Sequence, residues 1–178
     1  MLSRRQFVFA GGSALALTTG LLWFGARGWA GAQGDGKPAR AGGERLPVQK
    51  TDAEWRRTLT PEQYRVLRGR ATERSFTSPL NHETREGTFV CAGCGHALFS
   101  SKAKFESGTG WPSFWAPLAG AVETEVDRSW LMVRTEVHCA NCGGHLGHLF
   151  ADGPRPTGLR YCMNGVALRF TPTGTSLS

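Results

Sequence analysis

The chain has 178 residues, a length that fits one ordinary domain with a core large enough to fold without cross-links. Hydrophobic residues make up 40% of the sequence and charged residues 20%, which excludes an intrinsically disordered chain. The formal charge of +7 includes Arg4, Arg5 and Arg27 of the N-terminal segment, and the weakly basic remainder has no Lys/Arg run interleaved with aromatic residues. We therefore expect no nucleic-acid partner.

The N-terminus has the features of an export signal. Arg4 and Arg5 precede a moderately hydrophobic, glycine-containing stretch from Phe7 to Phe24, a pattern typical of a bacterial twin-arginine signal. Ala30–Ala32 supplies small residues for cleavage, so we expect residues 1–32 to be removed and the mature protein to be periplasmic. The alternative is an uncleaved membrane anchor, because a stretch of about 18 apolar residues can just span a bilayer.

A linker and a single folded domain are expected after the signal. Residues 33–49 are rich in Gly, Ala, Pro and Arg and lack apolar periodicity, which predicts a flexible linker. The domain is expected over residues 50–173, with a short tail at 174–178. No internal repeat is visible beyond two CxxC motifs.

Two short helices are predicted ahead of a region of strands. Thr51 and Glu54 form a capping box for the first helix, and Thr60-Pro61 starts a second helix that ends near Gly69. Helical periodicity then disappears, and short apolar or alternating runs follow between glycine-containing turns. These runs are Thr88–Cys91, Ala97–Ser100, Ala121–Asp127, Leu131–His138, Leu149–Ala151, Arg160–Asn164 and Ala167–Thr171. The pattern predicts a mostly antiparallel β fold.

Five cysteines form two CxxC pairs and a singleton. Cys91 and Cys94 make the first pair and Cys139 and Cys142 the second, and each pair can present two thiolates to a metal from one tight turn. The doubled motif predicts one structural Zn²⁺ per chain, since four thiolates leave no open coordination position. Two small disulfide loops are the alternative. Cys162 is left over, as either an inert core thiol or a nucleophile.

Several separate motifs occur in order along the domain. They are Thr72–Arg74, Glu106–Phe114, Cys142–Phe150, Arg160–Asn164 and Leu168–Phe170. Together with the CxxC pairs they resemble the type B methionine sulfoxide reductases, which act on the R epimer of the sulfoxide, over about residues 51–171. We accordingly expect a mostly β fold of two antiparallel sheets in a small barrel-like, tent-shaped arrangement, with short N-terminal helices and the zinc site.

The resemblance assigns roles to the residues around Cys162, which would attack the sulfoxide sulfur as a thiolate. It implies that His145, His148 and Asn164 hydrogen-bond the sulfoxide oxygen or a water, and that one imidazolium supplies a proton. Arg160, two residues before Cys162 on a strand, falls on the same face and could lower the thiol pKa. The alternatives are zinc ligation by the histidines and a plain turn at Asn164.

The resemblance also bears on the substrate and on recycling. Trp111 would hold the ε-methyl group of the substrate, with Phe114 beside it, although both could be core residues. Many relatives carry a second cysteine at the position of Thr109, which resolves the sulfenic acid by forming a disulfide. An external thiol or a partner protein must then act here, and for an exported protein this predicts a thioredoxin-like donor outside the cytosol.

The expected activity is therefore reduction of R-methionine sulfoxide in proteins, by a monomer that touches a membrane only if the signal is retained. The sequence leaves two rival functions. A non-catalytic zinc-ribbon module explains the CxxC pairs but leaves Cys162 and both histidines, His145 and His148, without a role. A thiol–disulfide oxidoreductase requires one CxxC pair to be free of metal.

Overall fold

The computed structural model describes residues 46–128 and 133–174. The predicted export signal (1–32), most of the predicted linker (33–49) and most of the tail (174–178) lie outside the described residues. Within the part of the chain that is described, no helix is both long and apolar enough to cross a membrane.

Two short helices open the domain, α1 (Asp52–Thr58) and α2 (Pro61–Leu67). Thr51 caps α1 through the predicted capping box: its hydroxyl accepts a hydrogen bond from the Glu54 N–H, and the Glu54 carboxylate accepts one from the Thr51 N–H. Thr60 caps α2 in the same way, so both predicted helix starts are confirmed. Because each helix is only two turns long, its stability must come from packing rather than from helix propensity.

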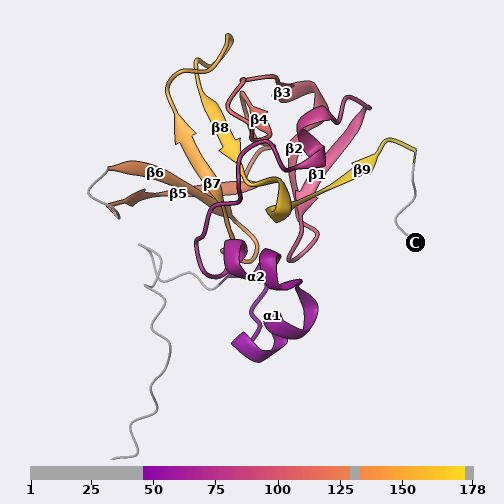
Figure 1. Cartoon of the computed structure of the whole chain (residues 1–178), viewed down its shortest axis with the longest axis vertical. Helices are drawn as coiled ribbons and strands as arrows, with labels where there is room; N and C mark the ends of the chain where they lie inside the picture. Colours follow the sequence, from indigo (N-terminus) through magenta and orange to yellow (C-terminus); the bar gives the residue numbers. More distant parts are fainter. Residues whose placement is uncertain (1–45, 129–132, 175–178) are drawn as a thin grey trace, which may run out of the picture. The chain divides into compact units, whose positions relative to one another are not determined.

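The strands form two antiparallel sheets, as expected (Figure 1). The three-stranded sheet has the order β2-β1-β9, with bounds Ala97–Ser100, Gly87–Cys91 and Leu168–Pro172. The six-stranded sheet has the order β3-β4-β8-β7-β6-β5, with bounds Lys104–Phe105, Ser113–Phe114, Arg160–Met163, His145–Phe150, Arg134–Cys139 and Val122–Asp127. Among the residues described, 3₁₀ turns occur at η1 (Pro79–His82) between α2 and β1, at η2 (Ser101–Ala103) between β2 and β3, and at η4 (Gly165–Ala167) between β8 and β9.

Aromatic residues from both sheets meet in the core. Phe114 of β4 stacks on Phe99 of β2 with ring centroids 4.3 Å apart, and meets Phe89 of β1 edge-on at 4.9 Å. None of these three side chains has any exposed surface. The core is therefore built on one face of the six-stranded sheet, and the other face of that sheet is free to carry polar side chains.

The predicted strand runs overlap the observed strands, except that they omit two short strands and most of β7. The runs did not include β3 and β4, because two-residue strands are too short for period-2 alternation to be recognisable. The run Leu149–Ala151 overlaps only the end of β7, so the prediction missed the part of that strand from His145 to His148. These corrections matter, because β4 and β7 flank the strand that carries Cys162.

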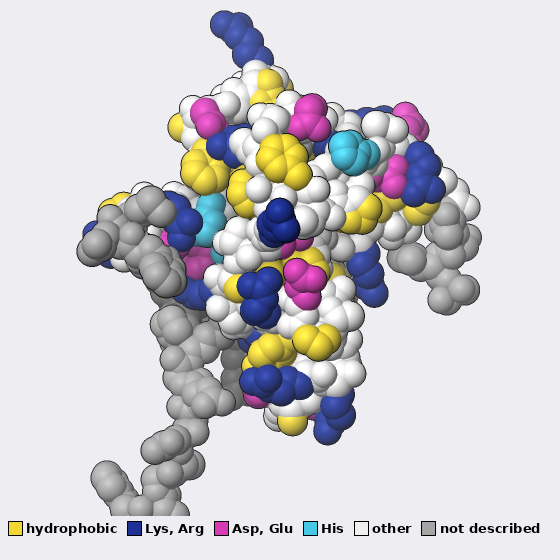
Figure 2. Space-filling model, in the orientation of Figure 1, with side chains coloured by type: hydrophobic (Ala, Val, Ile, Leu, Met, Phe, Trp, Pro, Cys, Tyr) yellow, Lys and Arg dark blue, Asp and Glu magenta, His cyan; other side chains and the backbone are white. Residues whose placement is uncertain are grey.

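The charged side chains do not gather into one basic stripe on the face shown in Figure 2. Lys and Arg side chains are spread over this face, among acidic and hydrophobic ones. Many of the basic groups on the described part of the chain pair with carboxylates, as Arg56 does with Asp52 and Arg85 with Glu83.

Candidate active site and metal centre

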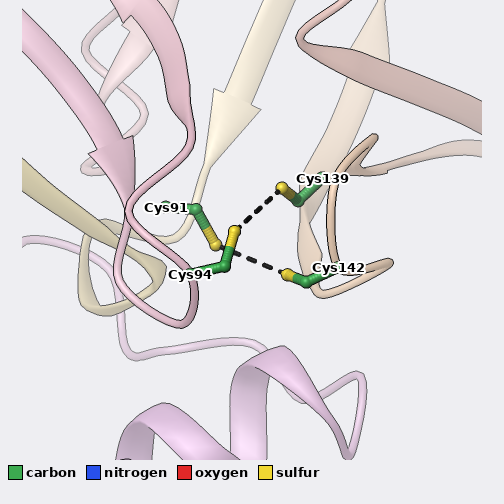
Figure 3. A group of neighbouring side chains, drawn as sticks. All are labelled: Cys91, Cys94, Cys139 and Cys142. Carbon is green, nitrogen blue, oxygen red and sulfur yellow. Dashed lines mark hydrogen bonds between the residues drawn. The ribbon is translucent and has the colours of Figure 1, made fainter. Parts of the chain in front are cut away.

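The four paired cysteines converge on one point (Figure 3). All four Sγ atoms lie within 4.8 Å of one another. Cys91 Sγ lies 3.8 Å from Cys142 Sγ, and Cys94 Sγ lies 3.7 Å from Cys139 Sγ. A tetrahedral ion with Zn–S bonds of about 2.3 Å requires sulfurs roughly 3.8 Å apart. A disulfide would need about 2.05 Å, and all five cysteines of the chain are free. The four thiols thus fit a metal ion and not two disulfide loops.

The two knuckles share one backbone conformation, which explains their similar sequences. Gly95 has φ 75° and Gly143 has φ 63°, in the left-handed region that favours glycine. The N–H of each glycine donates to the carbonyl of the first cysteine of its pair at 2.8 Å. Cys94 also accepts a hydrogen bond from the Asn141 side chain at 3.5 Å. Hydrogen bonds from the neighbouring thiols lower the pKa of Cys94.

The cysteine cluster joins the two sheets. Cys91 ends β1 of the three-stranded sheet, whereas Cys139 ends β6 of the six-stranded sheet. Trp55 and Leu67 of the two helices pack beside the first knuckle: a side chain at Gly93 would meet them at 3.4 and 3.5 Å. Figure 3 shows the helices next to the cluster. A metal here would cross-link segments far apart in sequence and stabilise the fold without taking part in chemistry.

Cys162 lies elsewhere, in a row of side chains across the six-stranded sheet. Residues paired directly across antiparallel strands point to the same face. On this rule one row crosses five strands and consists of Ser113, Cys162, His148, Glu136 and Glu125. A neighbouring row, two residues along, consists of Arg160, Phe150, Arg134 and Asp127. The sheet register therefore brings the predicted nucleophile, one predicted histidine and the predicted arginine to one face.

A pocket of about 120 Å³ opens on this face of the sheet. Its lining includes Cys162, His148, Trp111 and Asn164, all of which were predicted from the sequence. The remaining lining residues are Thr72, Arg134, Gly147 and Phe150. The pocket thus combines a thiol, an imidazole, an amide and two aromatic walls, which suits a small ligand with one apolar group and one polar group.

The environment of Cys162 controls its proton. Burial raises the pKa of the Cys162 thiol, while the Thr109 hydroxyl, 3.8 Å from Sγ, and the Arg160 guanidinium act to lower it. Thr109 Oγ1 lies 2.8 Å from Ser107 Oγ, which lies 2.8 Å from Ser113 Oγ. The thiol is therefore protonated before a substrate binds, with a chain of hydroxyl groups beside it.

The two histidines share one face, although they are three residues apart. In a regular strand this spacing would place them on opposite faces. The register of β7 shifts so that His145 pairs with His138 and Gly147 with Val137, which makes Leu146 a bulge residue. The rings of His145 and His148 consequently lie 5.4 Å apart.

Each histidine is paired with a carboxylate. His145 Nδ1 lies 2.8 Å from Glu136 Oε1, and Arg70 Nη1 lies 3.1 Å from the other oxygen of Glu136. His145 is buried, and its Nε2 has no hydrogen-bond partner among the residues described. Such an atom is suited to a buried water, and His145, unlike His148, does not itself line the pocket.

His148 is also paired with a carboxylate, which in turn contacts an arginine. His148 Nε2 lies 3.1 Å from Asp127 Oδ2, to which Arg134 donates at 2.8 Å. Burial lowers the pKa of His148, with Asp127 acting in the opposite direction. His148 is therefore neutral at neutral pH in the ligand-free protein. Sequence reasoning missed Asp127, Arg134 and Glu136, because nothing in the spacing of strand residues shows which cross-strand partners they face.

Asn164 and Trp111 are held by Glu73, a residue of the Thr72–Arg74 motif. The carboxylate of Glu73 accepts hydrogen bonds from the N–H groups of Gly165 and Val166, at 2.5 and 2.8 Å. Its own N–H donates to Asn164 Oδ1 at 2.8 Å, and its carbonyl accepts from Trp111 Nε1 at 3.2 Å. One buried residue thus fixes two walls of the pocket.

Arg160 lies on the expected face of the sheet but outside the pocket, whereas Phe114 lies in the core. Arg160 makes two hydrogen bonds of 2.8 Å to Asp152 and lies over Phe150, so it borders the site without lining the pocket. Phe114 has no exposed surface and belongs to the core, so the expectation that it contacts substrate is wrong. The reason is alternation: Ser113 shares the face of Cys162, and the next residue points the other way. Phe150 supplies the second aromatic wall.

Comparison with known proteins gives a consistent result. Residues 59–172 match the family model described as the SelR domain. The chain is 56% identical over 124 residues to a protein of Leptospira interrogans named peptide methionine sulfoxide reductase MsrB, covering 69% of this chain and 95% of the relative. Proteins of the same name are 58% identical over 126 residues in Bradyrhizobium diazoefficiens and 53% over 124 residues in Methanosarcina barkeri. These alignments cover 70% and 69% of this chain, and 91% and 87% of the relatives.

Proposed function

This chain belongs to the SelR-domain family of MsrB-type methionine sulfoxide reductases and reduces methionine-R-sulfoxide, and we propose that Cys162 is the nucleophile of that reaction. The observation that carries the assignment is the pocket, in which the one thiol outside the cysteine cluster faces His148 and Trp111. The corresponding enzyme activity is that of a peptide-methionine (R)-S-oxide reductase.

The reaction moves one oxygen atom from substrate sulfur to enzyme sulfur. The sulfur of Cys162 attacks the sulfoxide sulfur and forms an S–S bond, while the sulfoxide oxygen takes up the proton of the thiol. The hydroxyl group then passes from the substrate sulfur to the Cys162 sulfur: the substrate S–O bond and the S–S bond break, an S–O bond forms on Cys162, and the S–S electron pair returns to the methionine sulfur. The products are methionine and a sulfenic acid on Cys162. Two molecules of an external thiol then restore Cys162 and release water and a disulfide. The overall stoichiometry is one sulfoxide reduced for two thiols oxidised.

The proton passes through the histidines in this proposal. His148 is the direct cross-strand partner of Cys162, and such partners have Cβ atoms about 4.5–5.5 Å apart. Because Cys162 is a thiol and His148 is neutral before the substrate binds, the thiol proton can move to an imidazole as the sulfur attacks. The sulfoxide oxygen then receives a proton from His148, which lines the pocket, or from the buried Nε2 of His145 through a water. Asp127 and Glu136 stabilise the transient imidazolium ions.

The walls of the pocket would select the substrate epimer. Trp111 and Phe150 offer aromatic faces to the ε-methyl group, whereas the polar wall of His148 and Asn164 suits the oxygen. Asn164 Oδ1 is occupied by Glu73, and its Nδ2 already donates to Leu146, which leaves one amide hydrogen for the substrate. In the S epimer the ε-methyl group and the sulfoxide oxygen exchange places, so the oxygen would lie against the aromatic rings of Trp111 and Phe150.

The metal is proposed to be Zn²⁺, one per chain and structural. Four thiolates at these separations are the usual ligand set of structural zinc, and none of the four cysteines lines the pocket. Cys91, Cys94, Cys139 and Cys142 would hold it. The thiol–disulfide oxidoreductase alternative would require one of these pairs to be free of metal.

The source of electrons is proposed to be external. The other four cysteines belong to the cluster, and Thr109, whose Oγ1 lies 3.8 Å from Cys162 Sγ, stands where many relatives carry a resolving cysteine. The twin-arginine pattern at Arg4 and Arg5 supports export to the periplasm, where a thioredoxin-like donor would meet the sulfenic acid. Fractionation of cells that carry the Arg4→Lys/Arg5→Lys double variant tests this location: retention in the cytosol is expected, and unchanged export would contradict it.

The reaction is tested with peptides that carry separated R and S methionine sulfoxide epimers and with dithiothreitol as donor. The full chain is expected to reduce only the R epimer, and Cys162→Ser to reduce neither while retaining one metal per chain. Thr109→Ser is a matched control that keeps the hydroxyl group beside the thiol and should remain active. Failure of the folded, metal-loaded wild type to reduce the R epimer would instead favour the non-catalytic zinc-ribbon module.

A further inference from the structure

Phe76 is an exposed aromatic residue in a conformation that aromatic residues rarely adopt. Its side chain is 72% exposed, and its φ is 63°, in the left-handed region. This conformation is costly for a bulky side chain and persists only where the surroundings impose it. Burial of the ring in the core does not offset the cost, because the ring is largely outside the core. Phe76 therefore calls for an explanation at the surface.

The surroundings connect Phe76 to the catalytic pocket. Its N–H donates to the carbonyl of Gly110 at 2.7 Å, and its ring lies so close to Gly110 that a Cβ there would be 2.7 Å from the ring. Gly110 itself joins Thr109, which contacts Cys162, to Trp111, which lines the pocket. The exposed ring thus stands one residue from the aromatic wall of the pocket.

A second non-glycine residue with positive φ, Arg70, lies at the other end of the segment that contributes to the pocket. Arg70 has φ 55° and pairs through its side chain with Glu136, the carboxylate beside His145. Between Arg70 and Phe76 the chain supplies Thr72 to the pocket and Glu73 to its walls. Among the non-glycine residues described, these are the two with positive φ, and they bound one segment of the site. Residues held in rare backbone conformations cluster at active sites and ligand-binding sites, so the two positive φ angles indicate a role for this segment.

We propose that Phe76 is a specificity-determining residue, whose ring binds a hydrophobic side chain two positions away from the methionine sulfoxide in the substrate polypeptide. In an extended chain, side chains two residues apart point to the same face and lie about 7 Å apart. A substrate with its sulfoxide beside Trp111 would then present its neighbour to the ring of Phe76. The inference rests on the proposed function and adds to it a preference for apolar sequence context.

The test compares two pentapeptides with central R-methionine sulfoxide, Leu-Gly-Met(O)-Gly-Leu and Ser-Gly-Met(O)-Gly-Ser, both with blocked ends. Wild-type protein should favour the leucine peptide by about tenfold in kcat/KM, which burial of about 55 Å² of apolar surface would supply. Phe76→Asn should abolish the preference, because asparagine tolerates the left-handed conformation but offers no apolar ring. Phe76→Tyr, which keeps the ring, should retain it.

Two controls make the outcome decisive. Val126, 60% exposed on β5, is changed to Thr, and this variant should keep the preference. N-acetylmethionine-R-sulfoxide is too short to reach Phe76, so its turnover tests the reductase function separately and shows that Phe76→Asn is folded. Phe76→Gly, also compatible with the backbone, is the second variant. The proposal is overturned if wild type shows no preference, if Phe76→Asn and Phe76→Gly keep it, or if Val126→Thr loses it. Equal loss of turnover on the N-acetyl substrate would also overturn it.

Discussion

Replacement of Gly147 by alanine should disable the enzyme by separating the strand of the nucleophile from the strand of the histidine. Gly147 lies in β7 between Val137 of β6 and Met163 of β8. A Cβ at this position would lie 2.1 Å from the carbonyl oxygen of Cys162 and 2.9 Å from the Cα of Met163. Both obstacles are backbone atoms, so no side-chain rotation relieves them, and β7 and β8 must move apart by about 1 Å.

The separation of β7 and β8 should lower both the free energy of unfolding and kcat. Overpacking of this kind destabilises by about 1–3 kcal/mol, and each ladder hydrogen bond that is weakened adds about 1 kcal/mol. We expect a loss of about 3 kcal/mol in the free energy of unfolding, which lowers Tm by about 10 °C in a domain of this size. Because Cys162 and His148 face each other across these strands, an error of about 1 Å should lower kcat by about 100-fold.

The assay measures thermal unfolding and single-turnover reduction of R-methionine sulfoxide, well below the Tm of the variant. Gly120→Ala is the matched control, because no atom lies within 4 Å of a Cβ at Gly120, whose φ is 66°. It should lose only the cost of a left-handed alanine, about 1–2 kcal/mol, and keep its kcat. If Gly147→Ala keeps both wild-type kcat and wild-type Tm, the close approach of β7 and β8 is not what positions the nucleophile.

Three further outcomes are expected. Cys139→Ser should bind less than one metal ion per chain and lose cooperative thermal unfolding, because the metal links the two sheets; metal analysis and calorimetry check this. Arg160→Met should raise the pKa of Cys162 further, because a positive charge that favours the thiolate is lost; alkylation by iodoacetamide, followed against pH, should be slower at neutral pH and reach its plateau at higher pH. Asp127→Asn should lower the pKa of His148 further, because the carboxylate that favours the imidazolium is removed; the NMR titration of the His148 ring should move to lower pH.

Each of these outcomes has a control. Cys162→Ser should bind metal and unfold cooperatively, unlike Cys139→Ser. Arg85→Met removes a cation that pairs with Glu83, far along the chain from the thiol, and should leave the alkylation profile unchanged. Unchanged profiles in Arg160→Met, or an unmoved His148 titration in Asp127→Asn, would contradict the electrostatic roles given to these two residues.

Signals that act within a few residues allowed much of the fold to be predicted. The capping residues Thr51 and Thr60 start both helices, because a side-chain oxygen satisfies backbone N–H groups of the same turn. The glycines after each CxxC pair adopt the left-handed conformation that the knuckle needs. The choice of Cys162 over the other cysteines also followed locally, by elimination, since two CxxC pairs suffice for one metal.

The carboxylate partners could not be predicted in this way. Asp127 and Glu136 are separated from their histidines by 21 and 9 residues, and their pairing depends on the registers of β5, β6 and β7. Glu73 is 91 residues from Asn164, to which its N–H donates. No sequence period connects residues at such separations, because register is set by the packing of whole sheets.

The sequence by itself determined the family and the four cysteines that can hold a metal, and it predicted Cys162 as the nucleophile, since each depends on residue type at short, characteristic spacing. Tertiary structure alone decided which side chains share the face of Cys162. A one-residue bulge at Leu146 brings His145 beside His148, and strand alternation removes Phe114 from the site and leaves Phe150 in its place. The physical reason is that side chains alternate with a period of two along a strand, so a single residue of register exchanges the core for the catalytic face.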